Sequence, residues 1–177
     1  MIISLTGFMG CGKSSVGRRL PALLALNDVS FIDLDDYIEE NQGCSISTIF
    51  EEQGEKGFRE IETGCLNKVI EDFRGRNLVL SLGGGAIIHN SALIHENTFC
   101  VYLKASEDTL VGRLSRDTSR PLMQGPGGVD AVREKVRRLM GERAALYEAV
   151  AHASVDTEGL GVQGAARAVC AAFEKYR

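Results

Sequence analysis

The segment that most constrains this chain is Gly7–Ser14, with the sequence GFMGCGKS, close to the amino terminus. It follows a short apolar run, Met1–Thr6, and fits the phosphate-loop pattern G-x-x-x-x-G-K-[ST]. Glycines such as Gly10 and Gly12 can take backbone angles closed to other residues, so successive N–H groups can turn inward around an anion. The sequence therefore predicts a strand, a phosphate-binding loop and a helix, with ATP or GTP as the ligand.

Side chains within this loop suit particular parts of a nucleotide. Lys13 is placed to reach the β- and γ-phosphates, and the Ser14 hydroxyl is a hard oxygen suited to Mg²⁺. Cys11 is interpreted as a small filler, although amide dipoles could also activate its thiol. An accidental glycine-rich turn is the alternative, and the strand and helix around the motif argue against it. The expected nucleotide-binding residues are Gly10, Cys11, Gly12, Lys13, Ser14 and Ser15.

Length and composition are those of one compact globular domain covering residues 1–177, with 44% hydrophobic and 25% charged residues. A net charge of −4 argues against nucleic acid as the main partner. The five cysteines form no C-x-x-C pair, which disfavours a disulfide framework or zinc site and favours a reducing, cytoplasmic location. We expect neither a signal peptide nor a membrane span.

Five strand-like runs are expected at about 1–6, 29–33, 78–82, 99–103 and 152–156, separated by helical segments. This alternation predicts an α/β fold, a five-stranded parallel sheet with helices on both faces. Ligands of such sheets bind at the carboxyl ends of the strands. Pro21 predicts a kink or break in the helix that follows the phosphate loop.

The second strand leads into three carboxylates. Strand periodicity predicts that Asp33 and Asp35 lie on one side, with Asp36 free to cap the next helix. One of the first two could hold Mg²⁺, and the other could accept a proton or hydrogen bond from an attacking hydroxyl. The alternative is that both merely cap a helix.

Further candidates follow along the chain. Arg59 and Glu62 are three residues apart in a helix expected to open near Gly57, where a surface ion pair is the alternative. The run Gly83–Gly85 would let a substrate lie against backbone amides, unless it is only a tight turn. Arg143, in a helical stretch, could bind a carboxylate.

The stretch from 117 to 128 is rich in loop-forming residues. With Arg113, Arg116 and Arg120 on or beside it, this stretch predicts a mobile lid at approximately 113–128 that brings positive charge to phosphates. A plain surface loop is the alternative.

Taken together, the motifs resemble those of shikimate kinases, in order and spacing, over nearly the whole chain. The residues that carry the resemblance are Gly7–Ser14, Phe31–Asp35, Phe58, Arg59, Glu62, Gly83–Gly85, Arg120–Leu122 and Glu142–Tyr147. The resemblance implies a monomeric P-loop kinase of the nucleoside-monophosphate-kinase type. Such an enzyme transfers the γ-phosphoryl group of ATP to the 3-hydroxyl of shikimate, with Mg²⁺, on the route to chorismate and the aromatic amino acids.

The same resemblance implies roles for single residues. Lys13, Asp35 and Arg120 would be catalytic, and Ser14 and Asp33 would lie near Mg²⁺. Arg113 would flank the adenine base, and Arg120 would also contact the phosphates. The substrate-binding region would span approximately 33–62, and residues later in the chain would complete the site. The implied shikimate-binding residues are Asp35, Phe50, Phe58, Arg59, Glu62, Gly83, Gly84, Gly85 and Arg143. Val155–Gly159 resembles the adenine-side motif but lacks the proline that often follows.

Other functions fit less well. A gluconate-type sugar-acid kinase would share the phosphate loop, but the paired arginines and the glycine run favour shikimate. A switch-type GTPase or an inert nucleotide-binding module is a rival from another class. The guanine-reading motif Asn-Lys-x-Asp is not met, because Asn67–Ile70 lacks the final aspartate.

Overall fold

A computed structural model of the chain describes residues 1–115 and 128–177. The elements in order are β1 (Ile2–Thr6), α1 (Lys13–Gly17), η1 (Leu20–Ala22), β2 (Val29–Asp33), α2 (Leu34–Gln42), α3 (Ile46–Asp72), β3 (Asn77–Ser81), α4 (Ile87–Asn97), β4 (Phe99–Lys104), α5 (Glu107–Leu114), α6 (Gly128–Val150), β5 (Ala153–Asp156) and α7 (Gly161–Tyr176). Each expected strand is found within one residue of its expected bounds. The expected lid falls mostly on 116–127, outside the described residues.

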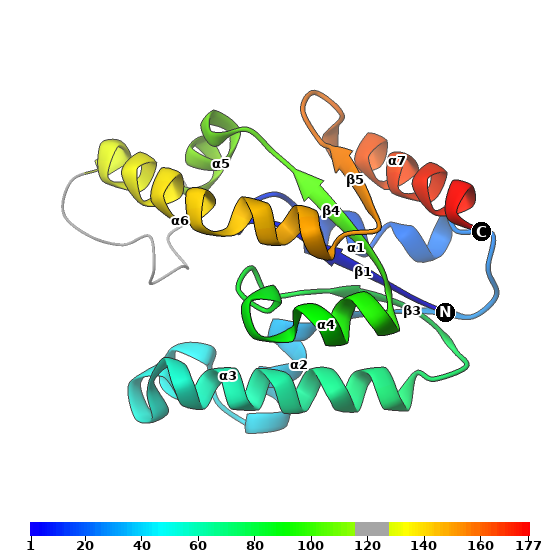
Figure 1. Ribbon diagram of the computed structural model, residues 1–177, viewed down its shortest axis with the longest axis horizontal. Coiled ribbons are helices and arrows are strands. Elements are labelled where there is room, and N and C mark those ends of the chain that lie inside the picture. The colour runs from blue at the N-terminus through cyan, green and yellow to red at the C-terminus, as the bar shows by residue number, and fades with distance from the viewer. Residues whose placement is uncertain (116–127) are drawn as a thin grey trace.

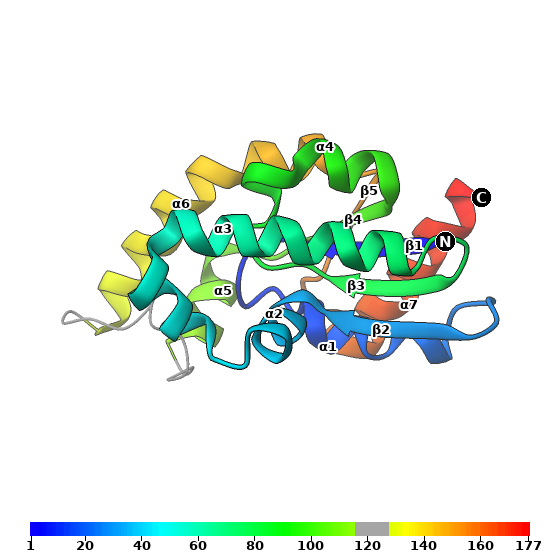
Figure 2. The same ribbon diagram turned by 90° about the horizontal axis from the view of Figure 1, so that it is seen from below.

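The strands form one parallel sheet in the order β2-β3-β1-β4-β5. Helices α3, α4 and α6 cover one face, and α1 and α7 cover the other (Figure 1, Figure 2). The strands in the middle of the sheet are almost wholly buried, whereas the edge strand β2 is mostly half-buried. The predicted α/β architecture with helices on both faces is therefore confirmed.

The strand order places a crevice between the carboxyl ends of β1 and β3. From β1 the chain crosses to β2 in one direction along the strand order. From β3 it crosses to β4 in the opposite direction. Ligands bind at such a switch point in open α/β sheets. The phosphate loop and the glycine run meet here, since a Cβ added to Gly84 would lie 3.3 Å from the amide nitrogen of Met9.

The helix after the phosphate loop is short. α1 ends at Gly17, and the chain continues into the 3-10 turn η1, whose first turn contains Pro21. Proline has no N–H to donate, so it suits the start of a new turn better than the interior of a continuing helix. The break expected at Pro21 is confirmed.

The start of α2 corrects one prediction. Asp33, not Asp36, caps this helix, because its Oδ1 accepts a hydrogen bond from the Asp35 amide at 3.1 Å. Asp36 instead pairs with Arg18 at 3.1 Å on the surface. Because β2 ends at Asp33, Asp35 belongs to the first helical turn, and strand periodicity does not apply to it.

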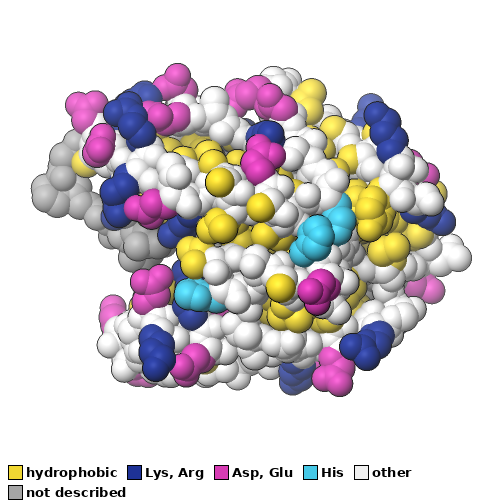
Figure 3. Space-filling view, viewed as in Figure 1, with side chains coloured by type: hydrophobic (Ala, Val, Ile, Leu, Met, Phe, Trp, Pro, Cys, Tyr) yellow, Lys and Arg dark blue, Asp and Glu magenta, His cyan; other side chains and the backbone are white. Residues whose placement is uncertain are grey.

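The charged surface and the cysteines do not by themselves indicate a function. On the face shown in Figure 3, positive and negative side chains are interspersed around hydrophobic ones over α4 and α6. All five cysteines are free thiols. Within 1–115 and 128–177, no helix is long and apolar enough to cross a membrane.

Candidate active site

The phosphate loop connects β1 to α1 with the backbone that its glycines predict. Gly7, Gly10 and Gly12 have φ angles of 142°, 82° and 101°, values that side-chain-bearing residues rarely adopt. The sequence pattern is therefore matched by a loop whose shape depends on glycine.

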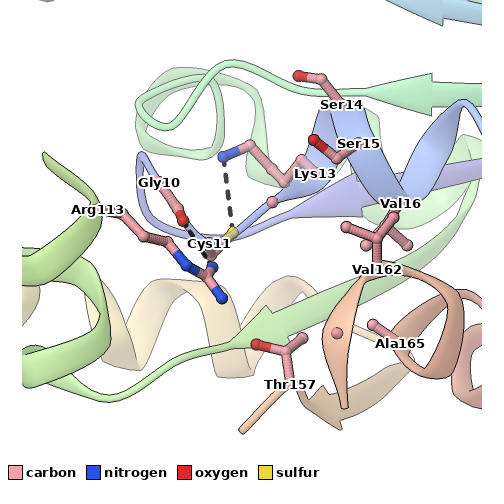
Figure 4. Close-up of a pocket in the computed structure, with 12 residues that line it drawn as sticks. Gly10, Cys11, Lys13, Ser14, Ser15, Val16, Arg113, Thr157, Val162 and Ala165 are labelled. Carbon is pink, nitrogen blue, oxygen red and sulfur yellow. Dashed lines mark hydrogen bonds between the residues drawn. The ribbon is translucent and has the colours of Figure 1, made fainter. Parts of the chain in front are cut away.

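A cavity of about 430 Å³ opens beside this loop (Figure 4). It is lined by Gly10, Cys11, Gly12, Lys13, Ser14, Ser15, Val16, Arg113, Thr157, Gly161, Val162 and Ala165. Seven of the eight residues expected to bind nucleotide, Arg113 among them, therefore line one cavity, and the eighth, Arg120, lies outside the described residues. Val16 and the α7 residues were missed from the sequence, because small and apolar side chains carry no chemical signature. Thr157 lies in the segment that resembles an adenine-side motif.

The Lys13 side chain is buried, and a buried ammonium group needs hydrogen-bond acceptors around it. Its ammonium donates to the carbonyl oxygens of Gly7 at 2.9 Å and Phe8 at 3.1 Å. It also lies 3.9 Å from the Cys11 sulfur (Figure 4). The Cys11 thiol is buried against Gly7, which supports its interpretation as a filler. A neutral cradle of this kind leaves the Lys13 charge available to an anion.

Three oxygen-bearing side chains follow one another across the base of the site. The Ser14 hydroxyl lies 3.5 Å from that of Ser81, and Ser81 is the register partner of Asp33 on the neighbouring strand. Among the described residues, no three His, Cys, Asp or Glu side chains gather into a metal site. These hard oxygens fit a cation such as Mg²⁺ that is held mainly by phosphates and water. Ser81 was not singled out from the sequence.

On the other side of the crevice, Arg59 and Glu62 form a buried pair with an Nη1 to Oε2 distance of 2.7 Å. Glu62 is 1% exposed and the Arg59 side chain 13% exposed, so the surface-pair alternative is wrong. Burial raises the pKa of Glu62, and the Arg59 charge opposes that rise. The Arg59 Nε atom is buried and has no hydrogen-bond partner among the described residues.

The glycine run lies against these side chains. A Cβ added to Gly83 would lie 2.8 Å from Asp35 Oδ1 and 3.0 Å from Glu62 Oε1. A Cβ added to Gly85 would overlap the Arg59 guanidinium. Asp35, Arg59 and Glu62 are therefore brought together at the carboxyl end of β3, and the run is more than a tight turn.

An aromatic pair stands next to this cluster. The rings of Phe50 and Phe58 stack with centroids 4.6 Å apart. The Arg59 guanidinium lies over the Phe58 ring, 5.1 Å from its centroid. The two phenylalanines of the implied shikimate-binding set thus adjoin Arg59, which belongs to the same set.

Helix α6 reaches the glycine run through Tyr147. This tyrosine is fully buried, and its hydroxyl donates to the carbonyl oxygen of Gly84 at 2.5 Å. Burial raises the pKa of Tyr147, and the nearby Arg143 guanidinium opposes that rise. Arg143 therefore lies next to the tyrosine that contacts the run, and its predicted role in binding a carboxylate stays a prediction. Tyr147 belongs to the motif Glu142–Tyr147 that carries the family resemblance, but the sequence predicted no role for it.

Arg113 lies where α5 ends, and it crosses to the phosphate loop. Its guanidinium donates to the Gly10 carbonyl oxygen at 2.8 Å (Figure 4). Glu158 ties the turn after β5 to α5, because it accepts hydrogen bonds from the Ser106 amide at 2.7 Å and the Thr109 hydroxyl at 3.1 Å. The predicted residue Arg120 lies outside the described residues.

Comparison with known proteins agrees with this geometry. A relative named shikimate kinase, from Stenotrophomonas maltophilia, is 42% identical over 157 residues, which cover 87% of this chain and 81% of the relative. The solved shikimate kinase from Acinetobacter baumannii in complex with shikimate is 35% identical, with a TM-score of 0.88 over 99% of this chain and 94% of that one. A gluconokinase from Sinorhizobium meliloti, 18% identical with a TM-score of 0.58 over 98% and 91%, shares the fold alone. The family model described as shikimate kinase matches residues 9–173, from the phosphate loop to the last helix, and the chain belongs to that family.

Proposed function

We propose that this protein transfers the γ-phosphoryl group of ATP to the 3-hydroxyl of shikimate, giving shikimate 3-phosphate and ADP on the route to chorismate. The observation that carries the proposal is the convergence of Asp35 and Arg59 on the glycine run beside the phosphate loop. A small acid that bears hydroxyl groups needs a cation for its carboxylate and an acceptor for its reacting hydroxyl. Both are present on the acceptor side of the crevice.

The donor side is the 430 Å³ cavity. The proposal assigns the phosphates to the amides of Gly10–Gly12 and to Lys13, and the base to the region between Arg113 and Thr157. Ser14 and Asp33 would hold Mg²⁺, which, when bound, neutralises charge on the transferring phosphoryl group. Arg120 is assigned the same neutralising role from a closing lid.

On the acceptor side, each group has a separate task. Arg59, fixed by Glu62, and Arg143 would grip the shikimate carboxylate, because two guanidinium groups bind such an anion with direction as well as charge. Phe50 and Phe58 would flank the ring. Asp35 would orient the attacking hydroxyl, so that most of the rate gain comes from positioning and electrostatics.

The remaining assignments rest on the family resemblance. We infer a monomer that acts in the cytoplasm, with ATP and shikimate as its ligands. Neither nucleic acid nor a membrane has a part in the proposed reaction.

The test is ADP release by the purified protein with ATP and Mg²⁺, run in parallel with shikimate, gluconate, a nucleoside monophosphate and no acceptor. Stimulation by shikimate alone is the expected result. Turnover on gluconate or the monophosphate without turnover on shikimate would keep the fold and overturn the acceptor assignment. No turnover with any acceptor would favour an inert nucleotide-binding module.

A further inference from the structure

Tyr147 makes a contact that the proposed chemistry leaves unexplained. Its hydroxyl donates at 2.5 Å to the carbonyl oxygen of Gly84, the middle residue of the glycine run. The two outer residues of the run are the ones that touch the acceptor-side groups, Gly83 at Asp35 and Gly85 at Arg59. The hydrogen bond to the middle carbonyl therefore lies between the two contacts with the acceptor-side groups.

The same side chain is also linked to the donor side. The Tyr147 ring stacks on Tyr102, with centroids 5.1 Å apart and an interplanar angle of 23°. Tyr102 lies under the phosphate loop, since a Cβ added to Gly7 would be 3.5 Å from its Cδ2 and 2.9 Å from the Cys11 sulfur. Tyr147 thus rests on the floor of the phosphate loop and holds the glycine run with its hydroxyl.

We propose that Tyr147 is a positioning residue, whose hydroxyl sets the spacing between the acceptor-side glycine run and the phosphate loop. This inference rests on the proposed function. In-line transfer requires the acceptor oxygen and the γ-phosphorus to be held at a fixed separation, and a displacement of about 1 Å can cost roughly 100-fold in rate. Gly84 lies close to the phosphate loop, since a Cβ added there would be 3.3 Å from the Met9 amide nitrogen and 3.7 Å from the Gly7 carbonyl oxygen.

The chemistry of the hydroxyl fits holding and not proton transfer. It is fully buried, its proton is already donated to a backbone carbonyl, and burial raises its pKa above the ordinary range. A neutral phenol remains a donor across the physiological pH range. The neighbouring Arg143 guanidinium opposes the rise in the pKa of Tyr147 by its charge and by a hydrogen bond to the same side chain, and burial outweighs both effects, so the neutral hydroxyl keeps its donor role toward Gly84.

The test compares Tyr147→Phe with Tyr102→Phe in the full chain. Both changes remove one hydroxyl from the same stacked pair, but the Tyr102 hydroxyl makes no hydrogen bond to another described residue. Shikimate-dependent turnover, the KM values of both substrates and ADP affinity are measured for each protein. The kcat is expressed per ADP-binding site found by titration, so that partial unfolding does not imitate a loss of rate.

For Tyr147→Phe we expect kcat with shikimate to fall about 10- to 100-fold, because the spacing acts on the transfer step, with the ADP Kd and the KM for ATP within about twofold of the parent. Tyr102→Phe should keep the parent's values. The inference is overturned if Tyr147→Phe retains the parent's kcat per site, including when only the KM for shikimate rises, which would place the effect on Arg143, or if the KM values of both substrates change alike. A parent protein with no shikimate-dependent turnover would overturn the proposed function, and this inference with it.

Discussion

At Gly85 the absent side chain is what gives the Arg59 guanidinium its place. Replacing Gly85 by Ala should displace the guanidinium and raise the KM for shikimate about 10- to 100-fold, because a charge-assisted hydrogen bond contributes about 1.5–3 kcal/mol. Steady-state kinetics at saturating ATP measures the change. Gly64→Ala is the matched control, since a Cβ there meets nothing within 4 Å. It should leave the KM unchanged and stabilise α3 by about 1 kcal/mol or less. An unchanged KM in Gly85→Ala would contradict the assignment of Arg59.

Asp35 and Asp36 are adjacent acidic residues with different surroundings. Asp35 lies against the glycine run, whereas Asp36 is paired with Arg18 on the surface. Asp35→Asn should reduce turnover by about 100- to 10,000-fold, as expected when a proton acceptor is lost, while sparing ATP binding. Asp36→Asn should have little effect, because exposed ion pairs contribute about 1 kcal/mol or less. Near-normal turnover of Asp35→Asn in the ADP-release assay would refute its role.

At the scale of helices and strands, the sequence predicted much of what positions the site. The strands were predictable because apolar runs alternate with helical segments, and the phosphate loop because its glycines stand where the backbone takes angles closed to other residues. The break at Pro21 followed from the missing N–H. The first residue of α2 was predicted too late in the chain. A shift of one or two residues decides which carboxylate caps the helix, and Asp33 is both the last residue of β2 and the cap of α2.

The partners of buried side chains were harder to predict. Tyr147 and Gly84 are 63 residues apart, and nothing local to either indicates that they meet. Whether Arg59 and Glu62 form a surface pair or a buried one also depends on what covers α3, which the three-residue spacing does not reveal. These contacts follow from the order of the strands, so a sequence pattern alone predicts the residue types and not their pairing.

His152, just before β5, is hydrogen-bonded to β4, and it should make the stability of the fold depend on pH in the acidic range. The Nδ1 atom of His152 accepts a hydrogen bond from the Cys100 amide at 3.1 Å, and its ring stacks on that of His95 at 4.3 Å. Burial lowers the pKa of His152 from 6.5, and the nearby His95 lowers it further. The unfolded chain then binds the proton more readily, so this stability is present in full above about pH 6.5 and is lost as pH falls toward the lowered folded pKa.

Urea unfolding between pH 5 and pH 7.5 tests this expectation. In His152→Asn the side-chain oxygen can still accept from the Cys100 amide, but the group no longer titrates. The free energy of unfolding of the variant should therefore depend less steeply on pH below about 6.5 than that of the parent. Equal slopes for the two proteins would show that His152 is not the source of acid sensitivity.

For the whole molecule, the strand order explains why distant segments form one site. The phosphate loop, the glycine run and the start of α2 each follow a strand, and parallel strands end at the same edge of the sheet. Because β1 and β3 are neighbours with connections that diverge, the donor and acceptor sides face each other across a crevice. Helix α6, from the far end of the chain, then fixes the acceptor side through Tyr147.

A site divided in this way should let nucleotide stabilise the whole fold without the acceptor. At ADP concentrations about 100 times Kd, binding to the folded state alone adds about 2.7 kcal/mol to the free energy of unfolding. For a chain of 177 residues this corresponds to a rise in Tm of roughly 5–11 °C. Lys13→Met should lose most of that rise, because the ammonium that meets the phosphates is gone, whereas Gly64→Ala should keep it. A thermal unfolding series with Mg²⁺ and ADP measures the shift, and an equal rise in Lys13→Met and the parent would remove Lys13 from the nucleotide site.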